Sequence, residues 1–173
     1  MKNTLIFLLA GAWLLGSCSK PESVAVKSAA AVPPSHADSL KQSQRLFDLA
    51  YSEYEPGHHD RALLFMDSAI AFDPDHAQAW QVKACCLAGL DRYVDARNAF
   101  DIAIRLKPDY RQAWWHRGCM HAVSGAVDSA LSDLRHAIAI DSNVRSWPFQ
   151  DDCWKSLRDN PKLLALTGTP NIR

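Results

Sequence analysis

The sequence repeats itself with a period of about 34 residues, and this period limits the folds that the chain can adopt. The stretch from Ala77 to Tyr110 returns in part when the chain is shifted by one such period in either direction. The forward shift pairs Trp80 with Trp114, Ala96 with Ala130, Ala103 with Ala137 and Ile104 with Ile138, and the backward shift reaches Ala62, Ala69, Ile70 and Pro74. Small residues that recur at this period are typical of helix–turn–helix arrays. We therefore expect an all-α solenoid of three units, residues 43–76, 77–110 and 111–144.

The residues that carry the central unit resemble a known repeat. They are Trp80, Ala84, Ala96, Phe100, Ala103 and Pro108, a set similar to the tetratricopeptide repeat (TPR). The third unit fits through Trp114, Gly118, Gly125, Ala130, Leu134 and Ala137, and the first through Leu46, Leu49, Ala50, Gly57, Ala62, Ala69 and Pro74. The third unit departs at Ser142, where the family has proline. The resemblance covers residues 43–144 and implies a right-handed α-solenoid, a fold that serves many different partners.

The apolar pattern and the breakers between repeats predict two helices for each unit. The first is expected to be capped by Asp38 or Ser39. The six predicted helices span residues 38–55, 60–72, 76–90, 93–106, 110–123 and 127–140. The recurring small residues let paired helices approach closely, so that larger neighbours interlock.

The N-terminal segment is typical of a targeting signal rather than of a folded element. Lys2 precedes an apolar run, Leu5 to Leu15, which is too short to span a membrane. The run ends at Ser17 and Cys18 and resembles a bacterial lipobox, in which the cysteine is acylated; an ordinary cleavage site with a chance cysteine is the alternative. We expect a signal peptide at 1–17, a lipid-anchored tether at 18–37, and a location at the outer membrane facing the periplasm.

The segment 145–173 is expected to cap the open end of the array. An array leaves the apolar face of its last unit exposed unless something covers it. We expect Trp147-Pro148-Phe149 to break the chain, a short helix to follow at 151–158, and Asn160-Pro161 to begin another. The residues predicted to cover the third unit are Trp154, Leu157, Leu163, Leu164 and Leu166.

Composition and motifs favour binding over catalysis. Lys plus Arg equals Asp plus Glu, 19 each, so no excess of charge indicates nucleic acid or an anionic membrane surface as a partner. The sequence lacks a Gly-rich phosphate loop, H-E-x-x-H and G-x-S-x-G. The seven histidines are scattered. We therefore predict no enzymatic activity, no cofactor and no metal site.

Three cysteines follow the repeat. Cys85, Cys119 and Cys153 are each separated from the next by one repeat period, and Cys86 adds a fourth thiol. Equivalent positions on neighbouring parallel helices lie about 8–10 Å apart, whereas a disulfide needs Cα atoms within about 7 Å. This argument favours free thiols, with one disulfide as the first alternative and a metal or redox site as the second.

The TPR resemblance also implies which residues line a concave groove. They are Gln44, Phe47, Tyr51, Tyr54, Gln78, Gln81, Cys85, Gln112, Trp115 and Cys119. Amides can pair with a peptide backbone while aromatic rings bury side chains, so we expect a protein or peptide partner. A solvated face with chance aromatics is the alternative, and so is a groove filled by the tether or by another copy of the chain.

The leading functional hypothesis is a lipid-anchored scaffold or adaptor module of the cell envelope. A thiol-dependent enzyme and a carrier of lipid or glycan remain alternatives. The sequence leaves the partner and the oligomeric state open.

One structural pair is also predicted within the third unit. Arg117 occupies a position where the family often has leucine, and Asp133 lies on the facing helix. We expect Arg117 to hold Asp133 through two parallel hydrogen bonds. Lys83, its equivalent in the central unit, faces Ala99 instead and is expected to extend its amine to water.

Overall fold

The computed structural model describes residues 35–55 and 57–168. The predicted signal peptide, the lipidated Cys18 and nearly all of the tether lie outside these residues. The first helix begins at His36, slightly before the predicted end of the tether at residue 37. The cap is Ser35 and not Asp38 or Ser39: the Ser35 hydroxyl accepts from the Asp38 backbone N–H at 3.2 Å and donates to the Asp38 carboxylate at 2.7 Å.

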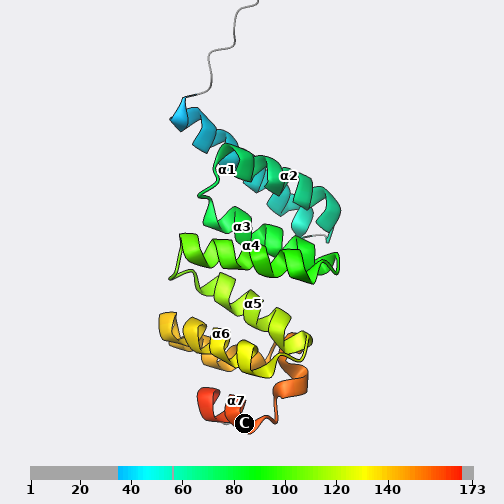
Figure 1. Cartoon of the computed structure of the whole chain (residues 1–173), viewed down its shortest axis with the longest axis vertical. Helices are drawn as coiled ribbons and strands as arrows, with labels where there is room; N and C mark the ends of the chain where they lie inside the picture. The colour runs from blue at the N-terminus through cyan, green and yellow to red at the C-terminus, as the bar shows by residue number, and fades with distance from the viewer. Residues whose placement is uncertain (1–34, 56, 169–173) are drawn as a thin grey trace, which may run out of the picture. The chain divides into compact units, whose positions relative to one another are not determined.

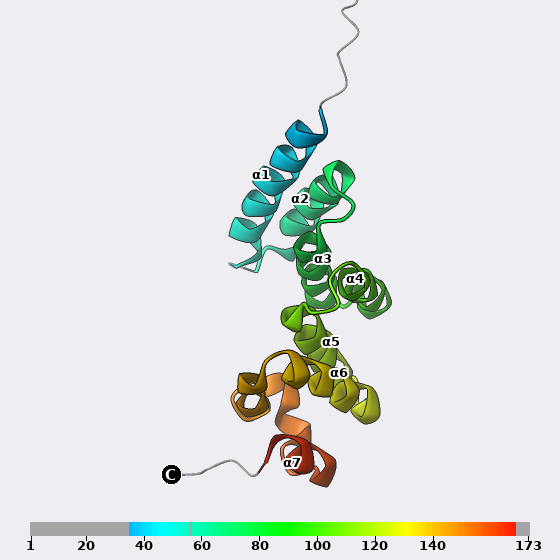
Figure 2. The same cartoon turned by 90° about the vertical axis from the view of Figure 1, so that its left-hand side faces the viewer.

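Three helix pairs form the body of the described chain, and each pair is joined by a short turn (Figures 1 and 2). Within the pairs α1 packs on α2, α3 on α4 and α5 on α6, and the pairs are connected through α2–α3 and α4–α5 contacts. The bounds are α1 His36–Tyr54, α2 His59–Phe72, α3 Ala77–Gly89, α4 Tyr93–Leu106, α5 Arg111–Val123 and α6 Val127–Ile140. The sequence predicted α4 and α6 to the residue, and the other helices with small errors at their ends.

The small residues of the repeat are buried where helices meet. Fully buried positions are Ala62, Ala69, Ala84, Ala96, Ala103, Ala130 and Ala137. Gly118 is also buried, and a Cβ atom there would lie 3.3 Å from the Asp133 Cβ and 3.4 Å from the Trp154 ring. A larger side chain at these positions would overpack the core at a cost of about 1–3 kcal/mol.

The C-terminal segment covers the third unit, as predicted, but with a different local structure. Trp147-Pro148-Phe149 does not break the chain, because Pro148 lies inside a 3₁₀ helix. Asp141 caps this helix, and its carboxylate accepts a hydrogen bond from the Asn143 N–H. The cap consists of η1 Ser142–Phe149, η2 Asp152–Leu157 and α7 Pro161–Thr167. Asn160 caps α7 with Pro161 at its first position, as expected.

Apolar side chains of the cap join the core of the last pair. Trp154 and Leu163 are fully buried and Leu157 is nearly so, whereas Leu164 and Leu166 are half-buried. Within the described ranges, no helix is both long enough and apolar enough to cross a membrane.

Candidate functional site: a groove along the first helices

A hollow of about 610 Å³ runs along the first helices of the three pairs, α1, α3 and α5, and we call it the aromatic hollow. Six of the predicted groove residues line it: Phe47, Tyr51, Tyr54, Gln78, Gln81 and Gln112. Four further residues complete the lining: Asp48, Val82, Tyr110 and His116. Tyr110 lies directly before α5. The TPR positions that line the groove do not include this place, so the sequence did not predict Tyr110 as a groove residue.

A row of aromatic rings forms one side of this hollow. The ring centroids of Phe47 and Tyr51 are 6.1 Å apart, and those of Tyr51 and Tyr54 are 6.2 Å apart. Tyr51 is 44% exposed, so much of its ring surface is open to a ligand. His76 packs against Phe47 at 5.0 Å and bonds to the buried Ser43 hydroxyl at 3.0 Å, which fixes the base of the row.

The four predicted groove glutamines differ in how far they are exposed. Gln44 and Gln78 are exposed and Gln112 is half-buried. Gln81, in contrast, is buried: it accepts from the Tyr110 hydroxyl at 3.1 Å and donates to the Cys85 sulfur at 3.1 Å. Gln81 therefore links α3 to Tyr110 beneath the groove surface, whereas the other amides are accessible to a ligand.

Trp115, predicted as an exposed anchor, lies beneath the cap instead. Only 5% of it is exposed, because Trp147 packs edge-on against it at 5.0 Å and Trp154 stacks on it at 5.7 Å. Its remaining surface lines a second hollow of about 520 Å³, the cap hollow, together with Trp147, Gln150, Asp151 and Asp152. The cap thus closes over the third unit and adds its own side chains to the groove.

A disulfide joins Cys119 of α5 to Cys153 of η2. The expectation of free thiols is wrong for this pair, whose Cα atoms are 5.3 Å apart. The argument from helix spacing fails because Cys153 does not lie on a fourth repeat helix but on a 3₁₀ turn that approaches α5 more closely than a parallel helix can. The separation of the two cysteines by one repeat period was the only signal in the sequence.

A third hollow of about 290 Å³, the apolar hollow, lies beside the disulfide. Its walls are Cys85, Ala88, Tyr93, Phe100, His116, Cys119, Met120, Val123 and Cys153. Predominantly apolar surface lines it, and it shares His116 with the aromatic hollow. Cys85 and Cys119, both predicted groove residues, therefore help to form a cavity that suits an apolar group.

The remaining thiols are poorly suited to nucleophilic chemistry. Burial raises the pKa of Cys85 to about 12 and that of Cys86 to about 11, so both stay protonated at neutral pH. An Asp151 carboxylate oxygen lies within 4.8 Å of the Cys119 and Cys153 sulfurs. Those sulfurs share a disulfide, however, and are not thiolate ligands for a metal.

Comparison with known proteins rests on structure alone, since no family model and no curated protein matches the sequence. The first TPR of Spaghetti (RPAP3), bound to the HSP90 peptide SRMEEVD, aligns at a TM-score of 0.58 with 15% identity, over 68% of this chain and 87% of that one. The TPR domain of Arabidopsis OM64 gives 0.59 and 18% identity, over 68% and 92%. The Yersinia enterocolitica type III secretion chaperone SycD, in complex with a peptide of the translocator YopD, gives 0.58 and 16%, over 71% and 90%.

The fold is that of a TPR solenoid. At these identities the likeness shows the fold alone, and the site must be argued from this chain's own residues.

On the other side of the TPR pairs, a cation joins each unit to the one before it. Lys83 bonds to Asp67 of the preceding unit at 2.6 Å, and its amine lies 5.1 Å from the Trp80 ring centre. Arg117 repeats this arrangement one period later, with Asp101 at 2.5 Å and the Trp114 ring at 4.8 Å. Lys83 therefore has a carboxylate partner, and the expectation that it only extends to water is wrong.

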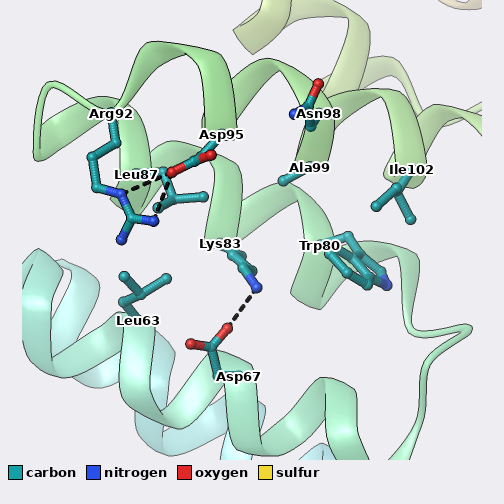
Figure 3. A pocket seen from close by; sticks show the side chains of 10 residues that line it. All are labelled: Leu63, Asp67, Trp80, Lys83, Leu87, Arg92, Asp95, Asn98, Ala99 and Ile102. Carbon is teal, nitrogen blue, oxygen red and sulfur yellow. Dashed lines mark hydrogen bonds and ion pairs between the residues drawn. The ribbon is translucent and has the colours of Figure 1, made fainter.

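The Lys83 junction also leaves a hollow of about 270 Å³ between α2, α3 and α4 (Figure 3). In the next junction Arg117 also reaches Asp133, and Trp114 stacks on His136 at 4.2 Å. The central unit has Ala99 and Ile102 at the corresponding places, and both line the hollow. Smaller side chains thus account for this space, and its carboxylates are already paired: Asp67 with Lys83, and Asp95 with Arg92.

Proposed function

We propose that this protein is a peptide-binding module that holds a segment of a partner protein in the groove along α1, α3 and α5. The observation that carries the proposal is the aromatic hollow, where the exposed ring of Tyr51 lies among the accessible amides of Gln78 and Gln112. Two similar TPR structures, those of RPAP3 and SycD, contain a bound peptide.

The groove chemistry suits an extended peptide. Aromatic side chains are common binding anchors because they bury a large area and lose little conformational entropy. An amide side chain offers both a donor and an acceptor, which matches the paired N–H and C=O groups of a peptide backbone. A thiol-dependent reaction has less support, because burial raises the pKa of Cys85 to about 12.

Selection of peptides followed by titration tests this proposal. Peptides would be selected from a random display library on the full chain, and their dissociation constants measured by fluorescence anisotropy. Tyr51→Ala should weaken binding by about 1–3 kcal/mol, the usual cost of removing an anchor. The matched control is Leu64→Ala on α2, a residue that is 69% exposed and does not line the aromatic hollow. Equal affinities for the two variants would place the binding site outside the groove.

We further propose that the module is lipid-anchored at Cys18 and acts as a scaffold or adaptor in the bacterial cell envelope. The lipobox-like run before Cys18 supports this location. Mass spectrometry of the protein from native membranes should find an acylated chain that begins at Cys18. An unmodified Cys18, or a chain beginning further along, would show that the anchor is absent.

A further inference from the structure

The three hollows on the groove side lie next to one another. His116 lines both the aromatic and the apolar hollow. Asp151 of the cap hollow has a carboxylate oxygen within 4.8 Å of the Cys119 sulfur, which lines the apolar hollow. A ligand lying along α1, α3 and α5 can therefore contact all three.

Charge on this surface has one sign. Asp48 lines the aromatic hollow, and Asp151 and Asp152 line the cap hollow. Among the described residues that line the three hollows there is no lysine or arginine. Burial lowers the pKa of His116, so this histidine does not supply a compensating charge at neutral pH.

Two of these carboxylates also lack a cationic partner elsewhere in the described ranges. Asp48 accepts a hydrogen bond from the neutral Gln44 amide at 2.8 Å, and Asp151 accepts one from the Cys153 backbone N–H at 3.0 Å. Neither forms an ion pair with a lysine or arginine in the part of the chain that the structure describes. Asp152 is 94% exposed and meets Arg158 only at 3.6 Å, a contact that water largely screens.

Three carboxylates outside the groove, in contrast, have close cationic partners. Asp67, Asp101 and Asp133 each pair with Lys83 or Arg117 at 2.5–2.6 Å. Figure 3 shows that the hollow at the Lys83 junction holds its cations and carboxylates in matched pairs. The groove, in contrast, presents carboxylates that a bound cation would complement.

We infer that the groove selects a partner segment that carries a lysine or arginine next to an apolar side chain. Basic residues of the segment contact Asp48 and Asp151. The apolar side chain enters the apolar hollow, whose volume of about 290 Å³ accommodates one such group. This inference rests on the proposed function and specifies the chemical class of its partner. It excludes acidic peptides, because they would bring like charges together where the lining residues include carboxylates and no lysine or arginine.

The composition of selected peptides is the first test. A random display library selected on the full chain should be enriched in lysine and arginine beside leucine, methionine or valine, and depleted in aspartate and glutamate. One selected peptide would then be made in three versions, with its basic residues kept, changed to glutamine or changed to glutamate. We expect affinity to fall in that order, and the affinity of the basic version to fall as salt is raised.

Neutralising the carboxylates is the second test. Asp48→Asn and Asp151→Asn should each weaken binding of the basic peptide by about 2- to 5-fold, the range of a solvent-exposed ion pair. The distant sites should act independently, so the double variant should lose about 4- to 25-fold. Asparagine keeps the capping role of Asp151 at η2. Asp60→Asn on α2 changes the net charge equally but lies outside the groove lining, so it should leave the affinity unchanged.

The outcomes separate this inference from the proposed function. A chain that selects no peptide overturns both. Selected peptides that are acidic or uncharged, yet lose affinity with Tyr51→Ala, leave the proposed function standing and overturn the charge preference. Basic peptides whose affinity falls equally with Asp60→Asn and with Asp151→Asn also overturn it, because the attraction would then come from overall charge.

Discussion

Arg117 holds Asp133 with two parallel hydrogen bonds, from Nε to Oδ2 at 2.9 Å and from Nη2 to Oδ1 at 2.6 Å. This is the two-pronged geometry expected from the sequence, and it joins α5 to α6. The Asp133 side chain is 5% exposed and that of Arg117 is 16% exposed, so little water replaces the bonds when one partner is lost. The third nitrogen of the guanidinium, Nη1, reaches Asp101 on the preceding unit.

Asp133→Ala should destabilise the fold clearly. The change leaves the largely buried Arg117 guanidinium without its main partner. Such a loss costs about 3–5 kcal/mol when no other partner remains. Because Asp101 still contacts Arg117, we expect urea unfolding to show a loss of about 2–4 kcal/mol in the free energy of unfolding. Asp101→Ala should cost less than about 1 kcal/mol, since its carboxylate is half exposed.

The comparison needs a control that does not touch Arg117. Asp101 cannot serve, because it bonds to the same guanidinium. Asp60→Ala on α2 provides a surface carboxylate without a cationic partner in the described ranges. Equal unfolding midpoints for the Asp133 and Asp60 variants would show that the buried pair contributes nothing.

The same pair should be transferable to the central unit. Lys83 and Ala99 occupy the places in this unit that Arg117 and Asp133 occupy in the next, and both line the hollow of Figure 3. The free energy of unfolding of the double variant Lys83→Arg with Ala99→Asp should exceed, by about 0.5–3 kcal/mol, the value expected from adding the effects of the two single variants.

A second background checks that the gain comes from pairing. With Lys83→Ala, the new carboxylate of Ala99→Asp has lost a cation that lines the same hollow, so Ala99→Asp should be most destabilising there. Strictly additive changes in all backgrounds would mean that the second junction cannot hold an arginine–aspartate pair.

The disulfide should contribute measurably to stability. Cys119 and Cys153 are separated by 34 in the sequence, and chain entropy predicts about 3–4 kcal/mol for a loop of that length. Adding dithiothreitol to oxidised protein should lower the urea midpoint, whereas a Cys153→Ala variant should be less stable and insensitive to the reductant. Mass spectrometry that finds four free thiols in protein from an oxidising compartment would contradict the assignment.

Acidification should weaken the fold through the half-buried His116. Burial lowers the pKa of His116 below its ordinary value of 6.5, although the nearby Asp151 opposes the effect. The unfolded chain therefore binds a proton at a higher pH than the native chain, and the free energy of unfolding should fall as the pH drops below about 6.5. His116→Gln should flatten this slope, and His36→Gln, at an exposed position, should not. An unchanged slope in the His116 variant would assign the effect to other groups.

Repetition made the helices predictable. Ala96, Ala103, Ala130 and Ala137 mark where α4 and α6 cross their partners, and both helices have the predicted bounds. The start of α1 was harder to place, since Ser35, Asp38 and Ser39 are all good caps and only the chain geometry selects Ser35. Local preference thus identifies elements but does not always fix their ends.

Tertiary contacts made by the cap could not be predicted from a repeating pattern. Trp115 occupies a groove position, yet Trp147 and Trp154 cover it because the segment after the repeats turns back onto α5. The same turn brings Cys153 to Cys119. Both outcomes depend on where a non-repeating segment packs, and the spacing of Cys119 and Cys153 by one repeat period is the one sequence signal of that packing.

Photocrosslinking of a selected peptide gives the sharpest test of binding in the groove. A benzophenone amino acid would replace Tyr51 or Leu64 on α2, two exposed positions of which only Tyr51 lines the aromatic hollow. Groove binding predicts a crosslink from position 51 that unlabelled peptide suppresses, and none from position 64. A crosslink from position 64 alone would contradict it, because the peptide would then bind outside the groove.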